Sequence, residues 1–198
     1  MLSRRPNVID DTRGAAFVEF LIAFLPVYVF FLCLVQLSLL FSVKLVTEHA
    51  AVNAARAAAV VIGDEPRRYG GERLHQVTDG RGERYKAIRN AAVLTLAPLI
   101  LNGTVQGVDV LFPPAERPGG DGRRGPLRFT PMGAHEVEKI RVRLEVDTAC
   151  RIGFANRITC PLLGALTRPR VHVRFDMPSI VVRAEAVYPY QGARYAYP

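Results

Sequence analysis

The sequence predicts an α+β protein in which a long N-terminal helix crosses a membrane, continues outside it and packs against a small antiparallel sheet. Two patterns carry this prediction. Residues 20–43 hold no charged side chain, and at about 1.5 Å per residue they exceed a hydrocarbon core of about 30 Å. Residues 137–147 alternate apolar and polar side chains, the period of a strand with one buried face.

The first 14 residues form a short polar leader. They carry arginines, and the orientation rule therefore assigns the leader to the cytoplasm and the rest of the chain to the other side of the membrane. The apolar core of a cleavable secretory signal is about 7–15 residues long, which is shorter than this run. An uncleaved signal anchor remains an alternative.

The N-terminal helix is predicted over residues 15–62, spanning the membrane to about residue 46. Pro26 interrupts the apolar run, which a membrane helix tolerates as a kink. Beyond the membrane, the alanine-rich segment 50–59 favours helix and offers a smooth face that lets other elements approach closely. Gly63, Asp64 and Pro66 then end the helix.

Residues 63–198 are predicted to form one extracytoplasmic α+β head. Residues 65–84 are expected to connect to a second, amphipathic helix over 83–96 that ends before Pro98. Strands are expected at 104–112, 137–147, 170–176 and 179–187, with an exposed loop at 113–126. The two helices are the available cover for the apolar faces of the strands.

The C-terminal end carries several tyrosines. They form either a contact surface or the edge of a strand followed by a loose end. The residues are Tyr188, Tyr190, Tyr195 and Tyr197.

Cys150 and Cys160 lie in the head, where an oxidising compartment permits a disulfide. Such a bridge would stabilise the protein by about 2–3 kcal/mol in the chain-entropy model. The alternative is a pair of buried free thiols. Cys33 lies inside the apolar run and is expected to face lipid or neighbouring helices as a small apolar residue.

The composition gives a formal net charge of +8 over 198 residues, and this excess lies after the apolar run. A basic surface can attract nucleic acid, anionic lipid or acidic polysaccharide, although a solvated face with clustered arginines is the favoured explanation of the charge. The four histidines are scattered, and the sequence has no phosphate-binding glycine loop and no nucleophile elbow. We therefore expect no enzyme activity, no cofactor and no metal.

The mouth of the apolar run has a pattern of its own. Gly14 is followed by the small residue Ala15, by Glu19 as the fifth residue after the glycine, and by Phe20. This order resembles the class III signal of type IV pilins and pseudopilins. With the proline and the alanine tract that follow, the first third of the chain resembles the TadE-like proteins, pilin-like minor components of tight-adherence pili.

The resemblance implies a role for each matching residue. A prepilin peptidase would cut after Gly14 and leave Ala15 as the new N-terminus. Glu19 would then guide processing or assembly by pairing with the amino group of Ala15 on a neighbouring subunit. The alternative for Glu19 is a carboxylate that merely reaches the lipid headgroups near the helix end.

The resemblance also implies partners and a location. The chain would sit in the bacterial inner membrane, with its head outside, among other pilin-like subunits and the pilus assembly platform, and would support surface adhesion and biofilm formation. A head of more than a hundred residues favours a minor, tip or priming component over the shaft subunit. The competing hypothesis is an unprocessed, membrane-anchored envelope protein whose basic head binds a partner, nucleic acid or polysaccharide.

Overall fold

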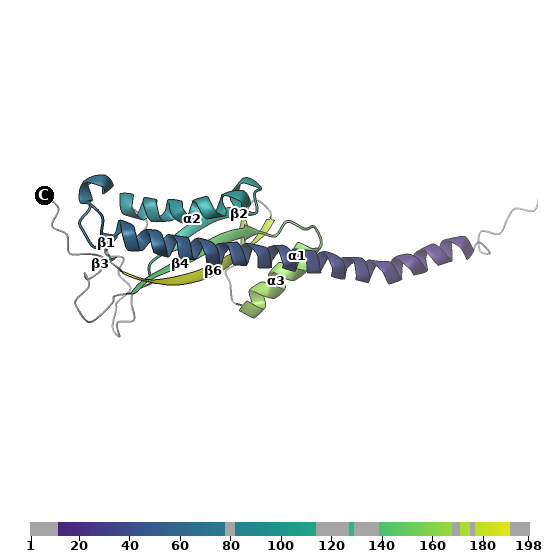
Figure 1. Ribbon diagram of the computed structural model, residues 1–198. Coiled ribbons are helices and arrows are strands. Elements are labelled where there is room, and N and C mark those ends of the chain that lie inside the picture. The colour runs from purple at the N-terminus through teal and green to yellow at the C-terminus, as the bar shows by residue number, and fades with distance from the viewer. Residues whose placement is uncertain are drawn as a thin grey trace, which may run out of the picture.

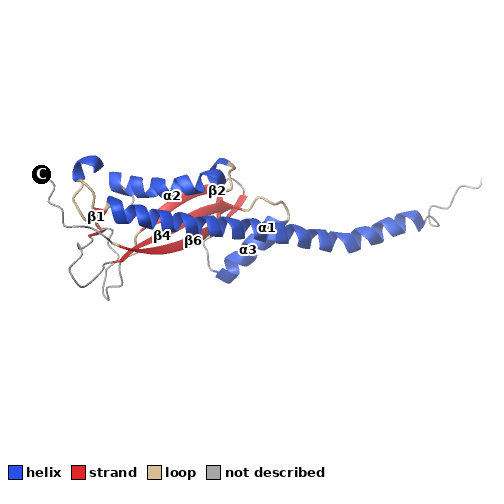
Figure 2. Cartoon of the chain, in the orientation of Figure 1, coloured by secondary structure: helices blue, strands red, loops and turns tan. Residues whose placement is uncertain are grey.

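The computed structural model describes residues 12–77, 82–113, 127–128, 139–167, 171–174 and 177–190. A 50-residue helix, α1 (Thr12–Val61), runs the length of the molecule, and its first half projects beyond everything else (Figure 1). The second half lies beside α2 (Glu83–Leu101), and both helices cover one face of a sheet (Figure 2). The predicted α+β arrangement, with helices covering a small antiparallel sheet, is confirmed.

The sheet has four antiparallel strands in the order β2-β4-β6-β5. They are β2 (Val105–Leu111), β4 (Lys139–Ala149), β5 (Val171–Arg174) and β6 (Met177–Pro189). Two short strands, β1 (Gln76–Val77) and β3 (Leu127–Arg128), pair separately. The strands predicted at 104–112, 170–176 and 179–187 therefore exist. Strand β6 is longer than predicted at both ends, and of residues 170–176 the structure describes 171–174, all of them in β5.

The central strand β4 shows the predicted alternation. Its apolar side chains Ile140, Val142, Leu144 and Val146 are fully buried under the helices. On the opposite face, Glu185 of β6 forms ion pairs with Arg141 at 3.2 Å and with Arg143 at 2.9 Å. The strand, predicted over 137–147, continues two residues further to Ala149, because its pairing with β6 extends that far; residues 137 and 138 lie outside the described residues.

Burial along α1 follows one stripe. Buried residues recur every three or four positions, which is the period of one helix face. The stripe begins with Gln36, Leu40, Val43 and Thr47 and continues through Ala50, Ala51, Ala54, Ala55, Ala58, Val61 and Ile62. The small alanine side chains let α2 and the sheet lie close to the helix, as the sequence indicated.

Two helix predictions need correction. Helix α1 begins at Thr12, three residues before the predicted start at Ala15. Helix α2 continues past Pro98 to Leu101. Pro98 and Leu94 are both exposed, so the carbonyl that the proline leaves unpaired is on the solvent side of the helix and costs little.

A third α-helix, α3 (Ala155–Thr167), was not predicted at all. It follows β4 and lies against the middle of α1, where the head ends and the projecting half begins (Figure 1). Cys150, at the end of β4, is joined to Cys160, inside α3, by a disulfide. Both cysteines are buried with Leu40 of α1 and Ile180 of β6.

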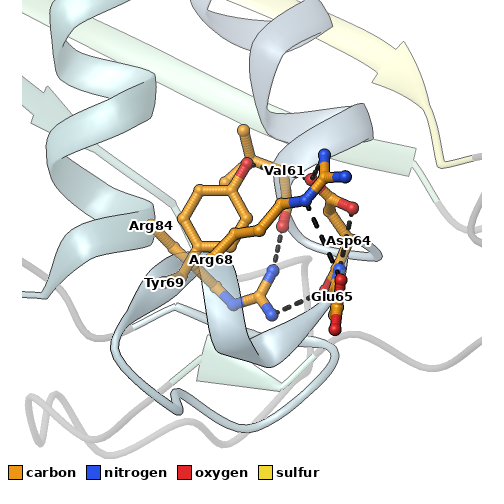
Figure 3. A network of polar contacts seen from close by, with 6 residues as sticks. All are labelled: Val61, Asp64, Glu65, Arg68, Tyr69 and Arg84. Atoms are coloured by element: carbon orange, nitrogen blue, oxygen red, sulfur yellow. Dashed lines mark hydrogen bonds and ion pairs between the residues drawn. The ribbon is translucent and has the colours of Figure 1, made fainter. Parts of the chain in front are cut away.

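The far end of α1 is closed by a buried arginine from α2. The guanidinium of Arg84 donates hydrogen bonds to the carbonyls of Val61 and Asp64 and lies 4.7 Å from the centre of the Tyr69 ring (Figure 3). Tyr69 belongs to the 3-10 helix η2 (Pro66–Tyr69). Arg84 thus satisfies carbonyls that a helix end leaves without partners.

The C-terminal tyrosines are divided between the core and the undescribed end. Tyr190 is fully buried, and its hydroxyl is hydrogen-bonded to the ring of His75; Tyr188 is half-buried against the core. The start of the predicted tail is therefore part of the core. Tyr195 and Tyr197, and nearly all of the predicted loop 113–126, lie outside the described residues.

Candidate functional site

The projecting half of α1 is uncovered by the rest of the chain. Residues 16–28 are all exposed, and residues 29–35 are exposed or half-buried. The exposed side chains are large and apolar, including Phe17, Phe20, Ile22, Leu25, Phe30 and Phe31. Among the described residues, α1 is the one helix long and apolar enough to cross a membrane, and no residue of its most apolar 18-residue window is buried.

Gly14, Ala15, Glu19 and Phe20 lie at the free end of this half. All four belong to the helix, and Gly14, Glu19 and Phe20 are exposed. A Cβ atom at Gly14 would meet nothing within 4 Å. Among the described side chains, none forms an ion pair with Glu19. The fold itself therefore gives no reason for a glycine or a carboxylate at these positions.

A column of aromatic rings lines one side of the same segment. Phe20 stacks on Phe24 with ring centres 5.3 Å apart, and Phe24 stacks on Tyr28 at 5.8 Å. The spacing of four residues puts the rings on one helix face. The column begins one residue after Glu19 and gives the segment a broad, stiff apolar ridge.

Gln36 marks the junction between the uncovered half and the head. Its side chain is buried, and its Oε1 atom accepts a hydrogen bond from the backbone N–H of Ile152 at 3.1 Å. Ile152 belongs to the turn that leads into α3. The head therefore reaches down α1 as far as Gln36, and the helix before it is uncovered for about 20 residues, or about 30 Å.

The remaining sequence candidates lie apart from one another, Cys33 on the projecting half of α1 and the others in the head. Cys150 and Cys160 are brought together, and Cys33 is a half-buried free cysteine on α1. His49 lies 3.4 Å from the amide of Asn53 on the exposed part of α1. In the part of the chain that the structure describes, no group of three or more His, Cys, Asp or Glu side chains is placed to hold a metal ion.

Two features of the site were missed by sequence reasoning. The predicted membrane span, which reaches about residue 46, includes Gln36 without assigning it a role, and no helix is predicted at α3. Gln36 was still a usable signal, because it is the first amide side chain after Pro26 in an otherwise apolar run.

Comparisons with protein-family models, with curated proteins and with solved structures found no match to this chain. Its class rests on its own geometry. It is an α+β protein with one candidate membrane-spanning helix at the N-terminus, and the second half of that helix forms part of the head's core.

Proposed function

We propose that the chain is a pilin-type subunit, a minor component of a tight-adherence pilus. Its helix α1 would be anchored in the inner membrane with the N-terminus in the cytoplasm and the head outside. The observation that carries the proposal is the uncovered, apolar first half of α1, which opens with Gly14 and Glu19 and continues without a break into the core of a head. A subunit that must pack its helix among others needs this combination.

The uncovered length supports a membrane level. Residues 16–35 match a hydrocarbon core of about 30 Å, whereas a span to residue 46 would draw the loop before α3 into lipid. That loop carries the charged, exposed side chain of Arg151, which is expensive in hydrocarbon. We therefore put the outer boundary of the membrane near Gln36, about ten residues earlier than composition predicted.

Glu19 lies within the proposed span, about one helical turn inside its cytoplasmic end. A carboxylate at the middle of a bilayer costs about 3 kcal/mol on insertion scales, and less near the surface. The free amino group of Ala15 on a neighbouring subunit would offset part of this cost as an ion pair. The exposed position of Glu19, clear of the described side chains, leaves it available for such a partner.

The test is assembly of the pilus in cells that carry the complete system. Glu19→Gln keeps the size of the side chain and removes its charge, so we expect the protein to reach the membrane at the normal level and to lose co-purification with neighbouring subunits. Glu48→Gln is the matched control, because Glu48 is on the same helix and exposed, with an ion pair to Lys44 at 3.2 Å. Equal co-purification of both variants would contradict the proposal.

A further inference from the structure

Helix α3 carries an apolar face that nothing in the described chain covers. Phe154, just before the helix, is 76% exposed, and Ile158 and Leu162 are 49% and 54% exposed. Ile158 and Leu162, four residues apart, lie on one face of the helix, and Phe154 precedes its first turn. Together these three large, exposed apolar side chains, called the stripe below, are typical of a surface that meets another apolar phase.

The orientation of this stripe is fixed by the opposite face of α3. Ala155, Thr159 and Cys160 are buried against the head, and Cys160 is bonded to Cys150 at the end of β4. The helix therefore cannot rotate to bury Phe154 and Ile158 without breaking the disulfide or exposing the inner face. The stripe faces outward by construction.

The backbone at Phe154 adds an independent sign. Its φ angle is +61°, in the left-handed region that glycine and asparagine adopt easily and that costs most other residues about 1 kcal/mol or more. A bulky side chain held there while largely exposed gains little from the described fold to offset that cost. Strain of this kind persists where a function requires it.

The stripe lies next to the proposed membrane surface. The loop before α3 is held to Gln36 by the Ile152 hydrogen bond, and α3 crosses α1 obliquely with its first turn nearest the projecting half (Figure 1). Phe154 follows Ile152 by two residues. If α1 spans the bilayer over residues 16–35, Phe154 lies at the boundary between headgroups and acyl chains, with Ile158 and Leu162 progressively farther out.

The charges around α3 match a lipid surface. Between Asp147 and Asp176 the sequence contains no Asp or Glu and five arginines. Two of these, Arg151 and Arg157, are exposed near the stripe; Arg151 donates one hydrogen bond, from Nη1 to the carbonyl of Asn102, and its other N–H groups can face a phosphate. Basic side chains flanking an apolar face are the composition of segments that lie in the interface of anionic membranes.

We infer that the first turns of α3 insert into the outer leaflet of the membrane that α1 crosses, with Phe154 deepest and Arg151 and Arg157 at the lipid phosphates. This contact rests on the proposed span of α1. It gives the head a second attachment point, so that the head is held at a fixed tilt and rotation above the bilayer instead of turning about a single helix.

The absence of tryptophan from the chain allows a direct test. Single tryptophans are placed at Phe154, Ile158 and Leu162, and the full-length chain is reconstituted into vesicles of phosphatidylglycerol and phosphatidylcholine that carry brominated acyl chains. Phe24→Trp, in the proposed span, is the positive control. Val60→Trp is the negative control, because Val60 is 68% exposed on α1 at the far end of the head.

We expect lipid quenching to be strong at Phe24, clear at Phe154, weaker at Ile158 and weakest at Leu162, and to be lost at Val60. Glycine adopts a positive φ angle without steric cost, so Phe154→Gly should leave the thermal stability of the protein in detergent unchanged or higher. The same variant removes the proposed lipid contact and should free the head to move. Circular dichroism checks that each variant is folded.

Quenching at Phe24 with none at Phe154 and Ile158 would overturn the inference and leave the membrane span intact. No quenching at Phe24 would instead contradict the proposed span itself. A blue-shifted but unquenched tryptophan at Phe154 would assign this face to a protein partner and would also overturn the lipid contact.

Discussion

At the scale of single residues, Arg84 is the most deeply buried charged side chain among those that the structure describes. It is fully buried, and burial lowers the pKa of its guanidinium, while the nearby Glu72, Tyr69 and Asp64 act in the opposite direction. The guanidinium group of an arginine keeps its charge in proteins. Its charged hydrogen bonds connect the start of α2 to the end of α1.

Replacing Arg84 by methionine should destabilise the head. The carbonyl of Val61 would keep only the 3.4 Å hydrogen bond from the backbone N–H of Asp64, and the half-buried carbonyl of Asp64 would lose the donor that Arg84 supplies, at about 1–3 kcal/mol for each group left unsatisfied. We expect a total loss of about 2–4 kcal/mol, measured by chemical unfolding in detergent. Arg67→Met is the control, because that side chain is exposed and its ion pair with Glu65 is 4.0 Å long. Similar midpoints for the two variants would refute the role given to Arg84.

The residues differ in how far sequence could predict them. Glu19 was visible because a carboxylate at the edge of an apolar run is rare. Arg84 was not, since it sits at the boundary between a polar connector and a helix, where an arginine is ordinary. Its partners are backbone carbonyls 20 and 23 positions away, and no sequence pattern indicates such a contact.

At the scale of elements, α1 consists of two halves with different surfaces. In the first half, residues 16–35 are apolar except for Glu19 and are exposed or half-buried, and the second half carries a buried stripe of alanines against α2 and the sheet. A helix that is apolar all round needs an apolar environment, whereas a one-sided stripe needs one packed partner. The change at Gln36 is thus a change of surroundings within one continuous helix.

The alanine stripe gives a prediction about packing. Ala54 and Ala58 have no exposed surface, so a leucine at either position forces extra atoms into a filled interface. We expect Ala54→Leu to cost about 1–3 kcal/mol of unfolding free energy in detergent. Val60→Leu, at an exposed position of the same helix, should change it by less than about 0.5 kcal/mol. A stability change at Ala54 no larger than that at Val60 would show that α2 does not pack closely there.

Elements were predictable where their pattern was regular. The alternation in β4 and the long apolar and alanine-rich segments of α1 identified both elements. Helix α3 was missed because Gly153 precedes it and Pro161 and Gly164 interrupt it. In addition, its inner face is built from Ala155, Thr159 and a disulfide instead of large apolar residues. The end of α2 was misjudged because an exposed proline in the last turn is tolerated.

At the scale of the whole molecule, one long helix has two parts, of which the first is proposed to lie in the membrane and the second forms part of the head's core. The head reaches down to Gln36, and the uncovered remainder has the length of a bilayer. Two features could not be predicted from the sequence: the end of the head at Gln36 and the outward-facing stripe on α3. Both depend on contacts between segments more than 100 residues apart.

The most direct test of the central claim is the intact mass of the full-length chain recovered from the membranes of cells with an active prepilin peptidase. The account predicts a mature protein that begins at Ala15. Gly14→Val should retain Met1 while folding normally, because a side chain at Gly14 meets nothing in the structure. A wild-type chain that still begins at Met1 would contradict the assignment of this protein as a processed pilin-type subunit.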